Sequence, residues 1–190
     1  MLRVMTATEP EGGMDRATQL ALNALNQRFY ASIASEWSDS RKQPWPGFER
    51  ILQRVTERRE LVNRANPANP TQVLRVLDLG CGDGRFAQFL ADHAALRSVA
   101  IAYLGCDASS ALLAHARGRE LSANYHFDQA DFVATPLSEV LPAGTFDLVC
   151  VLGVMHHIPG RSQRQRLVRT LSHYVAPQGL LALTTWRLDS

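Results

Sequence analysis

Short apolar runs recur along the second part of the chain, and their spacing predicts strands alternating with helices. Runs of this length are typical of strands buried in a parallel sheet; they occupy residues 73–79, 99–106, 124–127, 146–153 and 180–186. Between them, apolar residues recur at helical spacing, in residues 86–93, 109–119, 138–141 and 162–175. The last helix is expected to stop at Ala176-Pro177-Gln178-Gly179. The alternation predicts an α/β fold, a doubly wound parallel sheet with helices on both faces.

The first 70 residues have a different pattern. Residues 1–13 contain proline and paired glycines and predict a flexible tail. Residues 15–37 predict a long helix with one apolar face, formed by Leu22, Leu25, Phe29, Ile33 and Trp37. A second helix is predicted at 48–64, and its outer side carries a basic stripe of Arg50, Arg54 and Arg58. We therefore expect a tail, an N-terminal helical cap or lid at 14–70, and a cofactor-binding core at 71–190.

Length and composition predict a single soluble globular domain. The 190 residues carry a net charge of +2, which by itself does not indicate a nucleic-acid-binding protein. No apolar run is long enough to cross a membrane, and residues 1–13 lack the apolar segment of a signal peptide. The three cysteines, Cys81, Cys106 and Cys150, fit neither a disulfide framework nor a zinc site. We expect no metal, no membrane partner and a cytoplasmic location.

The glycine turn after the first core strand is the strongest candidate site. Gly80, Gly82 and Gly84 stand at alternate positions and lack a Cβ, so a ligand can lie against the backbone. The helix that follows offers unpaired N–H groups and a partial positive charge. In a dinucleotide-binding turn the third glycine comes one residue later, where this chain has Arg85. A turn with a purely structural role is the alternative.

The segment resembles motif I of class I S-adenosylmethionine (SAM)-dependent methyltransferases. That motif consists of an acidic residue at the end of a strand, the pattern G-x-G-x-G and a helix; the acidic residue here is Asp78. The resemblance implies the Rossmann-like fold of that class and SAM as the cofactor. It also implies that the cofactor contacts Asp78, Gly80, Cys81, Gly82 and Gly84.

The end of the second core strand supplies the next candidate, Asp107. It lies about 20 residues beyond the glycine turn, where α/β nucleotide-binding folds place a carboxylate for ribose hydroxyls. We expect Asp107 and the adjacent Ala108 to bind the cofactor. The alternative is a helix cap, because Asp or Ser at this place would cap the following helix in any case.

The ends of the third and fourth strands complete the expected site. In the resembling family, the position of Asp131 accepts a hydrogen bond from the adenine amine, and its neighbour, here Phe132, packs on the ring; an ordinary polar turn is the alternative. Gly153 ends the fourth strand, at the edge where such folds bind ligands. His156 and His157 follow, beside the expected methyl group, although either could be a buried structural histidine.

The N-terminal segment resembles the tRNA wobble-uridine carboxymethyl methyltransferases, a family that includes the methyltransferase domain of an AlkB homologue. The matching residues come in the family's order: Tyr30, Ile33-Ala34, Trp37-Ser38, Ser40-Arg41, Trp45-Pro46 and finally His156-His157. The resemblance covers about residues 29–186. Class I methyltransferases normally add an antiparallel hairpin after the fifth strand, and we expect this hairpin to be missing because the sequence stops at Ser190.

Three functions remain open. The first is a methyltransferase acting on the carboxymethyl group of a modified uridine in tRNA. A carboxylate acceptor has no proton to lose, so positioning is the main requirement; we predict that Arg41 binds the carboxylate or a phosphate and that Tyr30 and Trp45 close over the cofactor or base. The second is a small-molecule O- or N-methyltransferase, with His156 or His157 as the base. The third is a truncated, non-catalytic SAM-binding homologue.

The resemblance also implies partners. The first is tRNA, and the second is a small activator subunit, since eukaryotic members of the resembling family use a zinc-binding one. Self-association is the third expectation. Residues 180–186 would form an apolar edge strand without lysine or proline, and unprotected edges of this kind recruit other chains.

Overall fold

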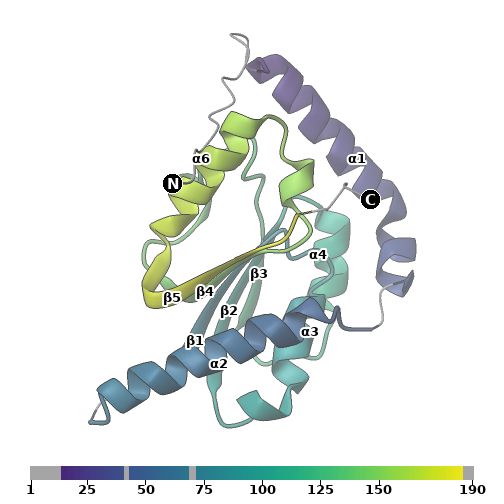
Figure 1. Ribbon diagram of the computed structural model, residues 1–190. Coiled ribbons are helices and arrows are strands. Elements are labelled where there is room, and N and C mark those ends of the chain that lie inside the picture. The colour runs from purple at the N-terminus through teal and green to yellow at the C-terminus, as the bar shows by residue number, and fades with distance from the viewer. Residues whose placement is uncertain (1–13, 41–42, 69–71, 186–190) are drawn as a thin grey trace, which may run out of the picture.

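A five-stranded parallel sheet forms the centre of the protein. The computed structural model describes residues 14–40, 43–68 and 72–185. The strands are ordered β3-β2-β1-β4-β5 (Figure 1). Their bounds are β1 Val73–Leu79, β2 Ala100–Asp107, β3 Tyr125–Gln129, β4 Phe146–Val151 and β5 Val175–Leu183. The order reverses between β1 and β4, and α/β sheets bind ligands at such a switch point, outside the carboxyl ends of the strands.

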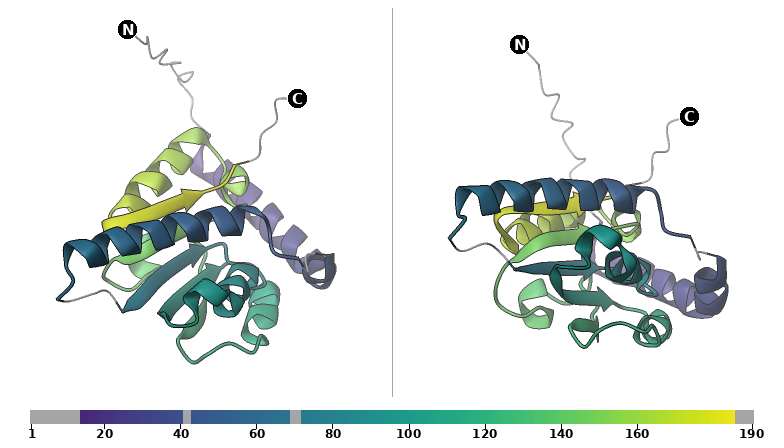
Figure 2. Two further views of the ribbon diagram at one scale, coloured as in Figure 1. Left: turned by 60° about the horizontal axis from the view of Figure 1, so that its bottom comes forward. Right: turned by 90° about the horizontal axis from the view of Figure 1, so that it is seen from below.

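Helices cover both faces of the sheet, as predicted. One face packs against α2 (Gly47–Ala65), α3 (Arg85–Asp92) and α4 (Ser110–Arg117). The other packs against α5 (Leu137–Val140) and α6 (Arg161–Ser172), and two short 3-10 helices, η1 (Ala94–Leu96) and η2 (Met155–His157), lie in the connections. Figure 2 shows α2 and α6 on opposite sides of β5. The architecture is the predicted Rossmann-like fold.

The central strand β1 divides its side chains between two cores. Leu74 and Val76 are fully buried in the cluster that includes α2, α3 and α4. Leu77 and Leu79 are fully buried in the cluster that includes α6. This alternation follows from the period of two along a strand. A strand covered on both faces can be apolar almost throughout, which is why the run at 73–79 was recognisable in the sequence.

The N-terminal helix α1 (Arg16–Ser40) packs against α4 and turns a polar face toward the protein. The prediction of a helix is confirmed, but the first part of its predicted apolar face is exposed, and only Ile33 and Trp37 at its end are partly buried. The side chains at Leu22, Leu25 and Phe29 are 38%, 55% and 53% exposed. The buried residues of α1 are Gln19, Asn23 and Ala34. The Asn23 amide donates hydrogen bonds to Asp131 at the site described below, and this long-range contact accounts for the orientation of the helix.

Strand β5 begins earlier than predicted. The expected helix stop at 176–179 lies inside the strand, because the register with β4 jumps from the pair Phe146–Val175 to the pair Leu148–Leu180. The extra residues form a bulge, in which Gln178 has a φ of 65°. Proline is tolerated in a strand at such a bulge or at an edge. Within the described residues β5 pairs with β4 alone, so the predicted edge position is confirmed.

Several predictions fall outside the described part of the chain. These are the tail at 1–13, the position of Arg41 and the end of the predicted fifth strand at Trp186. The division between a cap at 14–70 and a core at 71–190 stays a prediction. Helix α2 packs into the main core through Phe48, Leu52 and Val55. No helix among residues 14–40, 43–68 and 72–185 combines the length and the apolarity needed to cross a membrane.

Candidate active site

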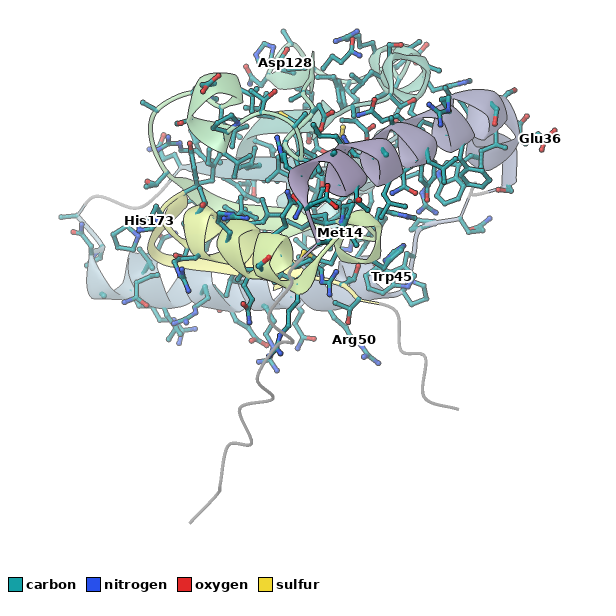
Figure 3. All side chains as sticks on the ribbon, turned by 90° about the horizontal axis from the view of Figure 1, so that it is seen from above. Met14, Glu36, Trp45, Arg50, Asp128 and His173 are labelled. Atoms are coloured by element: carbon teal, nitrogen blue, oxygen red, sulfur yellow. The ribbon has the colours of Figure 1, made fainter. Side chains whose placement is uncertain are left out.

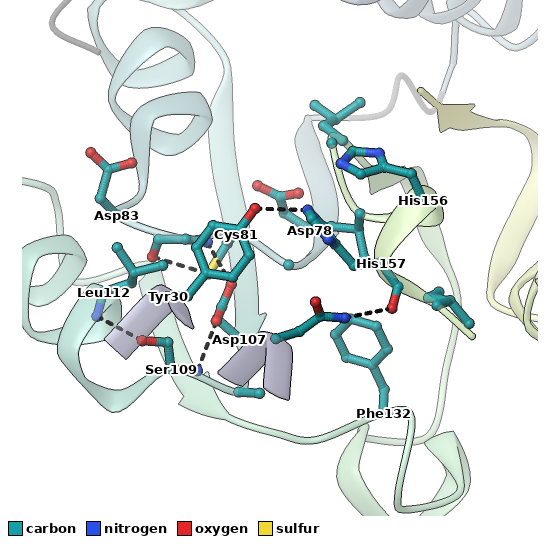
Figure 4. Close-up of a pocket in the computed structure, with 18 of the residues that line it drawn as sticks. Tyr30, Asp78, Cys81, Asp83, Asp107, Ser109, Leu112, Phe132, His156 and His157 are labelled. Atoms are coloured by element: carbon teal, nitrogen blue, oxygen red, sulfur yellow. Dashed lines mark hydrogen bonds between the residues drawn. The ribbon is translucent and has the colours of Figure 1, made fainter. Parts of the chain in front are cut away.

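A cavity of about 650 Å³ opens at the carboxyl ends of the strands, where the strand order reverses (Figure 4). Its volume is in the range of small-molecule sites. The structure brings together on its wall nearly all the residues predicted to bind the cofactor: Asp78, Gly80, Cys81, Gly82, Asp107, Ala108, Asp131, Phe132 and Gly153. Tyr30 and His156, predicted to act in catalysis, also line it. Gly84 does not line it.

Two glycines of the turn have different structural roles: Gly82 faces the cavity, and Gly84 packs against α4. Gly82 has a φ of 56°, and a Cβ there would meet only Leu112, at 4.0 Å. It therefore leaves backbone open to the cavity. Gly84 has a φ of 77°, and a Cβ there would lie 3.1 Å from the Cβ of Ala116 on α4. Its left-handed backbone and its lack of a side chain serve the start of α3 and its contact with α4, which explains why it stands back from the cavity.

Asp107 is held rigidly at the end of β2. Its Oδ2 accepts a 2.9 Å hydrogen bond from the backbone N–H of Gly82, and its Oδ1 accepts one of 2.8 Å from the N–H of Ser109 (Figure 4). Ser109 caps α4 by accepting from the N–H of Leu112 at 3.3 Å. Burial raises the pKa of Asp107, and the two N–H donors oppose that rise. A carboxylate has about four acceptor positions, so Asp107 can still receive hydroxyl donors.

Asp78 is a buried carboxylate on the cavity wall. It is 2% exposed, and its Oδ2 accepts a 2.6 Å hydrogen bond from the hydroxyl of Tyr103. Its Oδ1 has no hydrogen-bond partner within the described residues. Burial raises the pKa of Asp78 to about 7, against the opposing effect of the Tyr103 hydrogen bond. A cationic ligand group beside Oδ1 would stabilise the ionised carboxylate.

Asp131 ties α1 to the loop after β3. Its carboxylate accepts from the side-chain amides of Asn23, at 2.8 and 3.1 Å, and Gln27, at 2.7 Å. It also accepts from the backbone N–H groups of Val133 and Ala134, both at 3.0 Å. Helix α1 therefore closes this end of the cavity. An adenine amine would share the carboxylate with the two amides or displace them.

Tyr30 and His157 form a close pair on the wall of the cavity. The Tyr30 hydroxyl lies 2.7 Å from Nε2 of His157, and the rings meet edge to face (Figure 4). Asn26 donates a 3.0 Å hydrogen bond to the carbonyl of His157. Burial, and then His156, lower the pKa of His157 to about 4, and burial also lowers the pKa of His156. Both histidines are therefore neutral near pH 7, and the one bonded to Tyr30 is His157.

The amides of α1 are site residues that the sequence analysis missed. Asn23, Asn26 and Gln27 all line the cavity with Tyr30. With Gln19 they recur at helical spacing along one face, which is a visible pattern in the sequence. The sequence analysis expected the apolar stripe on the opposite face to be buried, so the amides were expected to face solvent.

The properties of the cavity fit SAM. The fixed carboxylate of Asp107 suits the ribose hydroxyls, and the Asp78 oxygen that has no partner within the described residues suits the ammonium group. Leu112 and Phe132 offer apolar walls for the adenine. With the reversed strand order and the glycine turn after β1, these features define a class I SAM-dependent methyltransferase.

Comparison with known families agrees. A family model described as a methyltransferase domain matches residues 77–181, and the chain belongs to this family. Its cofactor is S-adenosyl-L-methionine.

Two kinds of relatives stand out among curated proteins. The chain is 24% identical over 160 residues to the tRNA (carboxymethyluridine(34)-5-O)-methyltransferase ALKBH8 of Mus musculus; the match covers 84% of this chain and 19% of the mouse protein. It is 28% identical over 149 residues to the ubiquinone biosynthesis O-methyltransferase of Pseudomonas aeruginosa (strain LESB58), covering 73% of this chain and 60% of that protein. The chain thus spans about a fifth of the first relative and three fifths of the second.

Solved methyltransferase structures share the fold. The DhpI-SAM-HEP complex aligns with a TM-score of 0.54 at 20% identity, covering 92% of this chain and 66% of the other. The plantazolicin methyltransferase BpumL, in complex with a monoazolic analogue and SAH, aligns with a TM-score of 0.52 at 19% identity, covering 82% and 55%. At this level of identity the likeness concerns the fold alone.

Proposed function

We propose that the protein transfers the methyl group of SAM to the carboxylate of a carboxymethyl group on a modified uridine in tRNA. The observation that carries the proposal is the Tyr30–His157 pair, in which burial lowers the pKa of His157 to about 4. A general base works best with a pKa near the operating pH, and His157 is far below it. An acceptor that is already ionised needs no such base. The similarity to the tRNA methyltransferase of Mus musculus supports the same acceptor.

The chemistry then depends on positioning. Bound SAM supplies a methyl group on a sulfonium; as the acceptor oxygen forms its bond to that carbon, the carbon–sulfur bond breaks and a methyl ester results, with no proton released. Orientation of the two reactants can supply up to roughly 7–11 kcal/mol. Tyr30, Trp37 and Trp45 surround the cavity with aromatic rings, against which a flipped-out base can stack. The predicted role of Arg41 in binding the carboxylate or a phosphate remains part of this proposal.

Methylation of bulk tRNA tests the proposal. Purified protein is incubated with labelled SAM and total tRNA, and the nucleosides are analysed by mass spectrometry. We expect a mass increase of one methyl on a carboxymethylated uridine, lost on mild alkaline treatment because the product is an ester. Alkali-stable label would place the methyl group elsewhere, and an absence of label in tRNA, with and without an added activator subunit, would contradict the proposal.

A small-molecule acceptor is the second candidate. It is favoured by the 28% identity to the ubiquinone biosynthesis O-methyltransferase, which extends over a larger part of that relative. A hydroxyl or amine acceptor must lose a proton, so its turnover would rise with pH through the pKa of a base. At saturating SAM, turnover of a carboxylate acceptor would lack this rise, and the pH–rate profile measured under that condition separates the two candidates.

A further inference from the structure

A second hollow adjoins the cofactor cavity, between the start of α2 and the end of β5. It measures about 360 Å³ and shares Trp45 and Thr184 with the first cavity. Its other lining residues are Pro46, Gly47, Arg50, Ile51, Ala182 and Leu183. Trp45 is 43% exposed and packs edge-on against Phe48. A Cβ on Gly47 would overlap the Trp45 ring, so the ring lies against the backbone at the start of α2, and it lines both hollows.

Arg50 opens a row of arginines that leads away from this hollow. Arg54 and Arg58 follow at four-residue spacing, and each step advances about 6 Å along one side of the helix. Arg58 donates a 3.1 Å hydrogen bond to Gln178 in the bulge of β5, so the row runs beside that strand. Arg54 pairs with Glu57 at 3.1 Å, but the Arg54 side chain is 74% exposed, and an ion pair so exposed is weak enough to be exchanged for another anion.

We propose that Arg50, Arg54 and Arg58, together with the Trp45 hollow, bind the sugar-phosphate backbone of the RNA nucleotides next to the acceptor base. The inference rests on the proposed function. A base that enters the cofactor cavity leaves its phosphates at the rim, and Trp45 and Thr184 form the rim that both hollows share. Guanidinium groups bind phosphate through two parallel hydrogen bonds, and an exposed aromatic ring stacks on a base without regard to sequence.

Position distinguishes this row from the more basic helix α6. Helix α6 has four arginines and no carboxylate, but their offsets of three, two and three residues do not align them in one row. Arg164 of α6 is engaged with the carbonyl of Ile158 at 2.9 Å. The helix lies on the other face of β5 and does not border the second hollow (Figure 2). In Figure 3, Trp45 and Arg50 lie together at the border of the molecule.

Two variants with equal loss of charge test the inference. The first carries Arg50→Gln, Arg54→Gln and Arg58→Gln. The matched control carries Arg161→Gln, Arg166→Gln and Arg169→Gln, three exposed positions of α6. Binding of labelled tRNA is measured between 50 and 200 mM salt, with the KM for tRNA and the Kd for SAM. For the α2 variant we expect the KM for tRNA to rise about tenfold or more at low salt, and the slope of log K against log salt to become shallower by about 2.

The Kd for SAM and the turnover of a free nucleoside show whether the arginines bind a backbone phosphate or the acceptor carboxylate. The α2 variant should keep the wild-type Kd for SAM and wild-type turnover of the free nucleoside 5-carboxymethyluridine, which has no backbone phosphate. Loss of nucleoside turnover would overturn the inference, because the row would then bind the acceptor carboxylate. Wild-type tRNA binding in the α2 variant, or its loss in the α6 control instead, would overturn it as well. Failure of the proposed function is distinct: the wild-type protein would then methylate neither tRNA nor the nucleoside.

Discussion

The Tyr103 hydroxyl donates a 2.6 Å hydrogen bond to Oδ2 of Asp78 between the neighbouring strands β2 and β1, and both side chains are buried. The bond fixes the carboxylate of Asp78, a residue that lines the cavity, and leaves its buried Oδ1 without a hydrogen-bond partner within the described residues. It also opposes the rise that burial produces in the pKa of Asp78, which stands at about 7. The charge on the cavity wall therefore changes near neutral pH.

Stability and SAM affinity should depend on pH in opposite directions through Asp78. Its pKa is raised from 3.8 to about 7, so between those values the unfolded state loses a proton that the folded state keeps. The contribution to the free energy of unfolding is complete below about pH 4 and falls as the pH rises toward 7. Binding of the cationic SAM favours the ionised carboxylate, so SAM affinity should rise between pH 6 and 8. Thermal unfolding without SAM and calorimetric titration with SAM measure the two trends.

Variants of Asp78 and Tyr103 identify the group whose titration changes the affinity for SAM. Tyr103→Phe removes the donor that lowers the pKa of Asp78, so the rise in SAM affinity should move to higher pH. Asp78→Asn should abolish the rise and bind SAM weakly at every pH. A wild-type pH profile in Asp78→Asn would assign the titration to another group.

Asp107→Ala should weaken both SAM binding and the unliganded fold. Loss of hydrogen bonds to a charged group corresponds to about 1.5–3 kcal/mol in SAM affinity. The substitution also leaves the N–H groups of Gly82 and Ser109 without their acceptor, so the thermal midpoint without SAM should fall. Calorimetry and thermal unfolding are the measurements. Wild-type SAM affinity in a folded variant would show that Asp107 serves the turn alone.

The sheet and most residues of the cavity wall could be predicted from the sequence because both depend on local patterns. Strand β1 was predicted at its observed bounds, since it is apolar and bordered by glycine. Asp107 was found by its distance from the glycine turn. The role of Tyr103 could not be found in this way, because its partner Asp78 lies 25 residues earlier and the two meet only when β1 and β2 pair.

The orientation of α1 shows a different limit. Its apolar stripe satisfies the rule for an amphipathic helix, but a long-range interaction decides which face turns inward. The carboxylate of Asp131 accepts hydrogen bonds from the side-chain amides of Asn23 and Gln27, which lie 108 and 104 residues away in the sequence. The start of β5 was missed because proline and glycine, here Pro177 and Gly179, are common both in turns and in bulges. The local sequence therefore does not distinguish a helix stop from a bulged strand.

Loss of the contacts between α1 and Asp131 should let SAM dissociate from the cavity faster. The double variant Asn23→Ala, Gln27→Ala removes three of the contacts between α1 and that carboxylate. We expect faster SAM dissociation in stopped-flow measurements and faster proteolysis within residues 16–40, because local opening becomes easier. Leu25→Ala is the control, since this side chain is 55% exposed on the opposite face. Equal effects of the two variants would mean that general helix stability, and not the Asp131 contact, controls the cavity.

The exposed edge of β5 should cause the 190-residue chain to self-associate. Within the described residues β5 pairs with β4 alone, and Leu183 at its end is 38% exposed. An edge strand offers unpaired N–H and C=O groups, which natural proteins usually protect with charge, proline or a bulge. Here the bulge protects only the first part, at 176–179, and residues 180–183 continue as an uncharged run.

Light scattering over a range of concentrations should show association or precipitation. Leu183→Lys should reduce it, because lysine at an edge opposes pairing with a second copy. Leu25→Lys places the same charge on the exposed apolar stripe of α1 and should leave association unchanged. A monomeric wild-type protein at high concentration would contradict the prediction, and loss of association in Leu25→Lys alone would move the contact from β5 to α1.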